Sequence, residues 1–151
     1  MATILIIDDD ADGATAVARY MERAGHRAIL AANGRRALAS IALSRPDAVI
    51  LDMQMPQLDG VGFVKVLRGY FRNLGVPVAV LTGLPDGPKL DRIVEIGVRR
   101  IFRKTNVQMS ELLEWVNQAT RFSAPRADTT DLAPYGGSFQ IPGLQDSAPA
   151  E

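Results

Sequence analysis

The sequence predicts an α/β protein with a doubly wound, five-stranded parallel sheet and helices on both faces. Five short apolar runs alternate with segments in which apolar residues recur at every third or fourth position. This alternation is typical of parallel strands joined by helical crossovers. Two of the runs end in carboxylates, which places acidic side chains at the carboxyl edge of the sheet, where doubly wound folds bind their ligands.

The expected elements follow from these patterns in chain order. Ser110 is the expected N-cap of the last helix, and Gly25 and Gly97 stand where helices commonly end. The strand-like runs are 4–7, 28–32, 48–51, 76–81 and 100–102, and the helical segments are 14–21, 35–43, 61–67, 89–96 and 110–119.

Composition limits the domain count and the class of partner. A chain of 151 residues with 47% apolar residues can bury one ordinary core. Its 17 basic and 17 acidic residues cancel, so no global field attracts nucleic acid or an anionic membrane, and there is no apolar run long enough to span a bilayer. The absence of cysteine excludes thiolate metal sites and disulfides. We expect a cytoplasmic protein that binds neither nucleic acid nor membrane directly.

The composition changes near residue 122. Residues 123–151 hold four of the nine prolines and three glycines, without apolar periodicity. We therefore expect one domain over 1–121, followed by a tail over 122–151 that is too short and too irregular to form an output domain.

Acidic residues end two of the expected strands. Asp52 follows the run 48–51, and Asp8, Asp9 and Asp10 follow the run 4–7. Parallel strands would bring these carboxylates together, and each close pair of charges costs about 4 kcal/mol at an effective dielectric near 20. Such a cluster implies a bound cation or raised pKa values, and hard oxygen ligands favour Mg²⁺.

Two hydrogen-bond donors end the later strands. Thr82 closes the fourth run and Lys104 follows the fifth. Together with an acid pair that holds Mg²⁺ and a carboxylate nucleophile, these donors would form a phosphoryl-transfer site.

At this point the chain resembles the receiver domains of two-component response regulators. The resemblance extends from Ala2 to about Thr120, and the order and spacing of its motifs agree. The motifs are Ile-Leu-Ile-Ile-Asp-Asp-Asp at 4–10, Leu-Asp-Met-Gln-Met-Pro-Gln-Leu-Asp-Gly at 51–60, Thr82-Gly83 and Lys104. The resemblance implies a flavodoxin-like strand order of 2-1-3-4-5.

The resemblance also implies roles for single residues. Asp52 would be the phosphoacceptor, Asp9 a direct Mg²⁺ ligand, and Asp8 a ligand acting mainly through water. The backbone carbonyl of Gln54 would complete the metal site. Thr82 and Lys104 would each contact a phosphoryl oxygen, and Gly83 would leave the approach to Asp52 open.

A receiver domain is a signalling switch and not an enzyme acting on other substrates. The implied phosphodonor is a sensor histidine kinase or a histidine phosphotransfer protein. The implied output is a downstream protein bound on the face of the fourth helix, fifth strand and fifth helix, and a homodimer is possible. The chain would then be a single-domain regulator, similar to chemotaxis receivers.

The chain departs from the family pattern at two positions. Thr105 stands where a proline with a cis bond usually follows the lysine, so this peptide bond is expected to be trans or strained. Ile101 replaces the usual switch aromatic, and strand alternation should direct the adjacent Phe102 to the opposite face.

Two other functions remain open. One is a Mg²⁺-dependent phosphohydrolase with an aspartyl nucleophile, although Gln54 occupies the position where such enzymes carry a second aspartate. The other is a scaffold with an idle acidic site that acts through its tail. His26, the single histidine, is expected to be an exposed turn residue, which argues against a phosphodonor.

Overall fold

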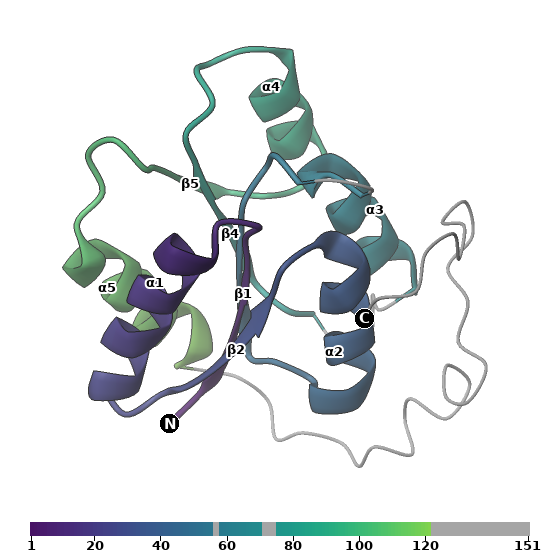
Figure 1. Cartoon of the computed structure of the whole chain (residues 1–151). Coiled ribbons are helices and arrows are strands. Elements are labelled where there is room, and N and C mark those ends of the chain that lie inside the picture. The colour runs from purple at the N-terminus through teal and green to yellow at the C-terminus, as the bar shows by residue number, and fades with distance from the viewer. Residues whose placement is uncertain (56–57, 71–74, 122–151) are drawn as a thin grey trace.

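Five parallel strands form one sheet in the order β2-β1-β3-β4-β5, as predicted (Figure 1). The computed structural model describes residues 1–55, 58–70 and 75–121, so the expected tail over 122–151 and Pro56 and Gln57 of the second motif lie outside the described residues. The strands are β1 (Thr3–Ile7), β2 (Arg27–Ala31), β3 (Ala48–Leu51), β4 (Val78–Thr82) and β5 (Arg100–Arg103).

Five helices cover both faces of this sheet, as predicted. Their bounds are α1 (Ala11–Arg23), α2 (Gly34–Ser44), α3 (Gly60–Tyr70), α4 (Pro88–Glu95) and α5 (Met109–Thr120). Helices α1 and α5 lie on one side of the strands, and α2, α3 and α4 on the other (Figure 1). Among the described residues, no helix is long and apolar enough to cross a membrane.

Strand alternation divides the core into two layers. On β1, Leu5 and Ile7 pack with α2, α3 and α4, whereas Ile4 and Ile6 pack with α1 and α5. The three central strands, β1, β3 and β4, are buried on both faces, which explains why each reads as a nearly continuous apolar run in the sequence. The apolar residues of both layers therefore fix the strand ends rigidly, and the polar residues that follow them are positioned by the core.

Two local predictions were wrong. Helix α5 begins one residue earlier than expected, and the residue before it is Gln108, whose N–H donates to Glu111 Oε1 at 3.1 Å; Ser110 lies inside the helix. His26 is half-buried rather than exposed. Its Nδ1 accepts a hydrogen bond from Ala2 N at 3.1 Å, which leaves Nε2 to donate to the Asn117 side chain at 2.8 Å. His26 thus ties the turn before β2 to both β1 and α5.

Candidate functional site

The strand register brings Asp8 and Asp52 side by side. Ile7 pairs with Leu51 across the β1–β3 ladder, so the next residue on each strand is the aspartate. The Asp52 N–H still donates to Ile7 O at 2.8 Å, which extends the ladder one step beyond the assigned strands. The core packing of two parallel strands thus aligns two carboxylates at the sheet edge.

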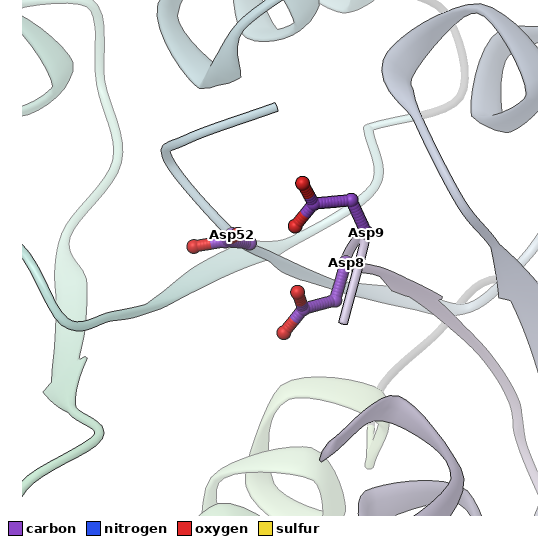
Figure 2. Close-up of side chains that lie close together, drawn as sticks. All are labelled: Asp8, Asp9 and Asp52. Carbon is purple, nitrogen blue, oxygen red and sulfur yellow. The ribbon is translucent and has the colours of Figure 1, made fainter. Parts of the chain in front are cut away.

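Asp9 completes a cluster of three carboxylates. One oxygen from each of Asp8, Asp9 and Asp52 lies within 4.8 Å of the others (Figure 2). Asp8 and Asp52 are buried, with 8% and 7% of their surface exposed, while Asp9 is open to solvent. This combination of buried and solvent-facing carboxylate oxygens suits a hard divalent cation that keeps some of its water.

Burial and the neighbouring carboxylate together raise the pKa of Asp52 to about 6. Burial of the carboxyl is the main cause, and the negative charge of Asp8 adds to it. The charge of Lys104 and a hydrogen bond from the backbone of Gln54 act in the opposite direction without cancelling the rise. Without a cation, Asp52 is therefore half protonated near pH 6 and becomes mostly ionised at pH 7.

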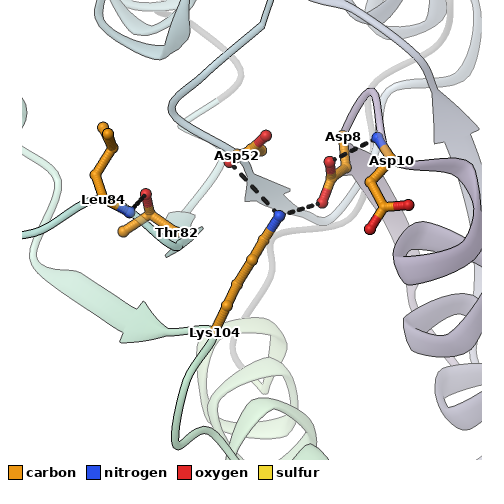
Figure 3. Close-up of polar contacts among 6 residues, drawn as sticks. All are labelled: Asp8, Asp10, Asp52, Thr82, Leu84 and Lys104. Atoms are coloured by element: carbon orange, nitrogen blue, oxygen red, sulfur yellow. Dashed lines mark hydrogen bonds and ion pairs between the residues drawn. The ribbon is translucent and has the colours of Figure 1, made fainter.

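Lys104 supplies the positive charge nearest to this cluster. Its Nζ lies 2.9 Å from Asp8 Oδ2 and 3.7 Å from Asp52 Oδ1 (Figure 3). Burial alone would lower the pKa of Lys104, but its hydrogen bond to Asp8 and the charges of Asp52, Asp8 and Asp10 raise it above 10.5. Lys104 is thus charged at neutral pH, and its ammonium contacts two of the three carboxylates, those of Asp8 and Asp52.

Thr82 lies at the same sheet edge but is turned toward its own loop. It is the last residue of β4 and only 1% exposed, and its hydroxyl accepts a hydrogen bond from Leu84 N at 3.0 Å (Figure 3). The Thr82 carbonyl accepts from Lys104 N at 2.9 Å, which joins the ends of β4 and β5. A Cβ placed on Gly83 would meet no atom within 4 Å, so the space beside Thr82 is open.

The segment after Asp52 is anchored by its methionines and by Gly60. Met53 and Met55 are buried, whereas Gln54 between them is exposed. Gly60 N donates to Met53 O at 3.2 Å, and a Cβ on Gly60 would lie 2.8 Å from Met53 Sδ. Only glycine permits this close approach, which fixes the backbone of Gln54 next to Asp52.

Arg103 is a polar residue of this region that the sequence analysis did not identify. Its Nη1 donates to Leu84 O at 3.0 Å, and its Nη2 forms an ion pair with Asp86. The signal available in the sequence was an arginine at the end of the strand Arg-Ile-Phe-Arg, but its partners lie 17 and 19 residues away and no local pattern indicates them.

The sequence model of the family described as "Response regulator receiver domain" matches residues 4–117. The chain belongs to this receiver family. The match includes each predicted site residue, from Asp8 to Lys104. Family membership favours the switch over the two alternative functions, because the matched range contains every residue of the acidic site.

Curated relatives of this receiver are response regulators. The transcriptional regulatory protein PrrA of Mycobacterium tuberculosis is 40% identical over 79 residues, which cover 52% of this chain and 33% of PrrA. The response regulator MprA of Mycolicibacterium vanbaalenii is 43% identical over 79 residues, which cover 52% of this chain and 33% of MprA. The matched part is about a third of the length of these relatives.

Solved receiver structures share the fold. The receiver domain of a Francisella response regulator, 1452, superposes with a TM-score of 0.73 at 27% identity, covering 82% of this chain and all of that one. The Vibrio cholerae chemotaxis protein CheY4 superposes with a TM-score of 0.71 at 28% identity, covering 79% of this chain and 98% of that one. These likenesses confirm the predicted fold of the receiver.

The two departures from the family pattern have local structural consequences. Within the described ranges no peptide bond is cis, so the bond from Lys104 to Thr105 is trans. Ile101 packs with the layer of α2, α3 and α4, and Phe102 with the layer of α1 and α5, which confirms the expected alternation. The Arg100 guanidinium lies over the ring of Phe102, with 4.4 Å between the guanidinium carbon Cζ and the centroid of the ring.

Proposed function

We propose that this receiver is a phosphorylation-dependent switch in which Asp52 accepts a phosphoryl group with the help of Mg²⁺. The observation that carries the proposal is the cluster of three carboxylates at the carboxyl edge of the sheet, two of which, Asp8 and Asp52, contact the ammonium of Lys104. When ionised, the three carboxylates exceed the charge of Lys104 by two, which matches one divalent cation. Asp8, Asp9, Asp52 and the Gln54 carbonyl would hold the ion.

Transfer requires little of the protein beyond positioning. A carboxylate oxygen of Asp52 attacks the phosphorus of a phosphohistidine, the P–N bond breaks, and the imidazole leaves with the electron pair and takes up a proton. The product is an acyl phosphate on Asp52. Bound Mg²⁺ would neutralise charge on the phosphoryl oxygens.

Lys104 and Thr82 would act on the phosphoryl oxygens. Lys104 is already within 3.7 Å of Asp52 and would pair with one of them. Thr82 would donate its hydroxyl proton to another, which requires the hydroxyl to move toward Asp52, either away from Leu84 or together with it. That rotation would move the loop between β4 and α4 and so change the face of α4, β5 and α5, where a downstream protein would bind.

Two further features belong to the same proposal. The phosphodonor would be a sensor histidine kinase or a histidine phosphotransfer protein. Attack of water on the phosphorus would break the bond to Asp52, release inorganic phosphate and reset the switch.

The decisive test is intact mass after incubation with acetyl phosphate and Mg²⁺. We expect one added phosphoryl group on the wild-type chain and none on Asp52→Asn or in the presence of a chelator. Asp47→Asn is a matched control at the opposite end of β3 and should be modified like the wild type. Equal modification of Asp52→Asn, or no modification of the wild type by acetyl phosphate or a phosphohistidine donor, would contradict the proposal.

A further inference from the structure

Arg103 points away from the carboxylates, toward the loop that joins β4 to α4. Successive side chains of a strand alternate between its two faces, so Arg103 shares the face of Ile101, which packs with the layer of α2, α3 and α4. Lys104, the next residue, reaches the carboxylates instead. Two adjacent cations therefore contact different parts of the site.

The backbone of Leu84 is held on both sides by these contacts. Its N–H donates to Thr82 Oγ1 at 3.0 Å, and its carbonyl accepts from Arg103 Nη1 at 3.0 Å. Arg103 also pairs with Asp86, two residues further along the loop. The side chain of Asp86 is 90% exposed, so the bond to the Leu84 carbonyl should contribute more than the ion pair.

Arg103 is itself anchored at its backbone. Its carbonyl accepts from Asn106 N at 3.2 Å and from Val107 N at 2.9 Å, which closes the turn after β5. The guanidinium therefore extends from an anchored backbone, and a movement of the Leu84 carbonyl toward Asp52 would lengthen its bond to Arg103 or force the Arg103 side chain to rearrange.

This geometry restricts Thr82. To reach a phosphoryl group on Asp52, the Thr82 hydroxyl must either release the Leu84 N–H or carry Leu84 with it. The first leaves a backbone donor without its partner, and the second breaks the contact of Leu84 with Arg103. Either movement is opposed by the arrangement of the loop.

We propose that Arg103 is a positioning residue that latches the loop between β4 and α4 and thereby sets how readily Thr82 turns toward Asp52. The proposal rests on the function proposed above and adds the residue that tunes it. Ile101 has no hydrogen-bonding group, so among these two residues of the strand face only Arg103 can hold the loop. Removing the latch should raise the fraction of molecules whose loop is ready to bind the phosphoryl group, and apparent affinity rises with that fraction.

The test is the affinity for beryllofluoride in saturating Mg²⁺, measured by calorimetry on the full chain. Beryllofluoride takes the place of the phosphoryl group on a carboxylate. We expect Arg103→Gln to bind it about twofold to tenfold more tightly, the range for one partly exposed, charge-assisted contact. The matched control Arg100→Gln removes the same charge from the same strand but contacts Phe102 and not the loop, so its affinity should not rise.

The direction of the change separates the latch from simple electrostatics. If Arg103 acted only as a positive charge near an anion site, its loss would weaken beryllofluoride binding. Weaker or unchanged binding in Arg103→Gln would therefore overturn the proposal.

A double-mutant cycle tests whether Arg103 acts through Thr82. In a Thr82→Ala background, Arg103→Gln should no longer change the affinity, because there is no hydroxyl to release. The same gain in both backgrounds would overturn the proposal. Failure of the wild type to bind beryllofluoride or to accept a phosphoryl group would contradict the proposed function itself, whereas equal affinity in wild type and Arg103→Gln contradicts only the latch.

Hydrogen exchange gives a readout that does not depend on the ligand. In Mg²⁺-free protein, Arg103→Gln should speed exchange of the Leu84 amide while the amides of β1 keep their protection. Loss of protection throughout the sheet would show that Arg103→Gln is globally destabilised. In that case Arg103→Lys, which keeps a hydrogen-bond donor and a positive charge, is the second test. If Arg103 latches the loop, Arg103→Lys should bind beryllofluoride with the wild-type affinity.

Discussion

At the ends of β1 and β3 like charges are crowded together, whereas at the ends of β4 and β5 polar groups are paired. Asp8 and Asp52 are buried next to each other and share one ammonium. Thr82 and Arg103, by contrast, each have a partner in Leu84. We call the ends of β1 and β3 the acidic end, and the ends of β4 and β5 the loop end. Without a cation, packing of the core holds the acidic end in place although its carboxylates repel one another. The loop end is held by its own hydrogen bonds. Removing a charge from the acidic end should therefore stabilise the fold, and removing a polar group from the loop end should destabilise it.

The largest expected effect is on metal affinity at the acidic end. Asp9→Asn removes one of the three negative charges that face the ion, and we expect Mg²⁺ affinity to fall about a hundredfold, because a charge at contact distance contributes several kcal/mol at an effective dielectric near 20. Calorimetric titration with Mg²⁺ measures this. Asp12→Asn, in the first turn of α1 and exposed, is the matched control. Equal affinities of the two variants would contradict a metal site at this cluster.

The next effect is a pH-dependent gain in stability on Asp52→Asn without metal. As pH rises, the unfolded chain loses the proton of Asp52 near its ordinary pKa of 3.8, while the folded chain keeps it until about 6. The wild type therefore loses stability across this window, by about 2–3 kcal/mol if about two pKa units separate the states. The free energy of unfolding in urea with a chelator should favour Asp52→Asn at pH 7 and show little difference at pH 4. If Asp52→Asn were less stable than the wild type at pH 7, the result would contradict a raised pKa of Asp52 in the folded chain.

The packing of the segment between β3 and α3 depends on Gly60. Gly60→Ala places a Cβ 2.8 Å from Met53 Sδ and 3.0 Å from Met53 Cα, so we expect a loss of about 2 kcal/mol in the free energy of unfolding. Gly69→Ala in the same helix meets no atom within 4 Å and should raise stability slightly, because alanine is the better helix former. Equal changes in the two variants would show that the close approach at Gly60 is unimportant.

The smallest effect is at the loop end. Thr82→Val keeps the shape of the side chain but removes the acceptor for the Leu84 N–H, and it should cost about 1 kcal/mol of stability, opposite in sign to Asp52→Asn. Chemical unfolding of both variants under the same metal-free conditions compares the two ends directly. A stabilising effect of Thr82→Val would contradict the view that the loop end is held by its hydrogen bonds.

The acidic end could be predicted from the sequence because it depends on strand patterning. Asp8 and Asp52 each follow an apolar run, and the parallel register of the two buried strands brings them together. The same reasoning located Lys104 after β5. The sequence positions of these side chains at strand ends follow from residues that are close in the chain, whereas the strand order was predicted from the resemblance to receiver domains.

The loop end could be predicted only in part. Thr82 was identified from its position, but no sequence pattern indicates that its hydroxyl accepts a hydrogen bond from Leu84, or that Arg103 donates to the same residue. The burial of His26 escaped prediction for the same reason, because Asn117 is 91 residues away. Contacts of single polar side chains across long sequence separations have no periodic signal.

A pH titration of the Asp52 carboxyl carbon by NMR, with and without Mg²⁺, tests most directly whether the acidic end is built to receive a cation. We expect a pKa of about 6 in metal-free protein and a clear decrease in saturating Mg²⁺, because the ion stabilises the ionised carboxylate. A pKa near 3.8 without metal that does not respond to Mg²⁺ would contradict the account, since Asp52 would then be neither crowded nor coupled to a metal site.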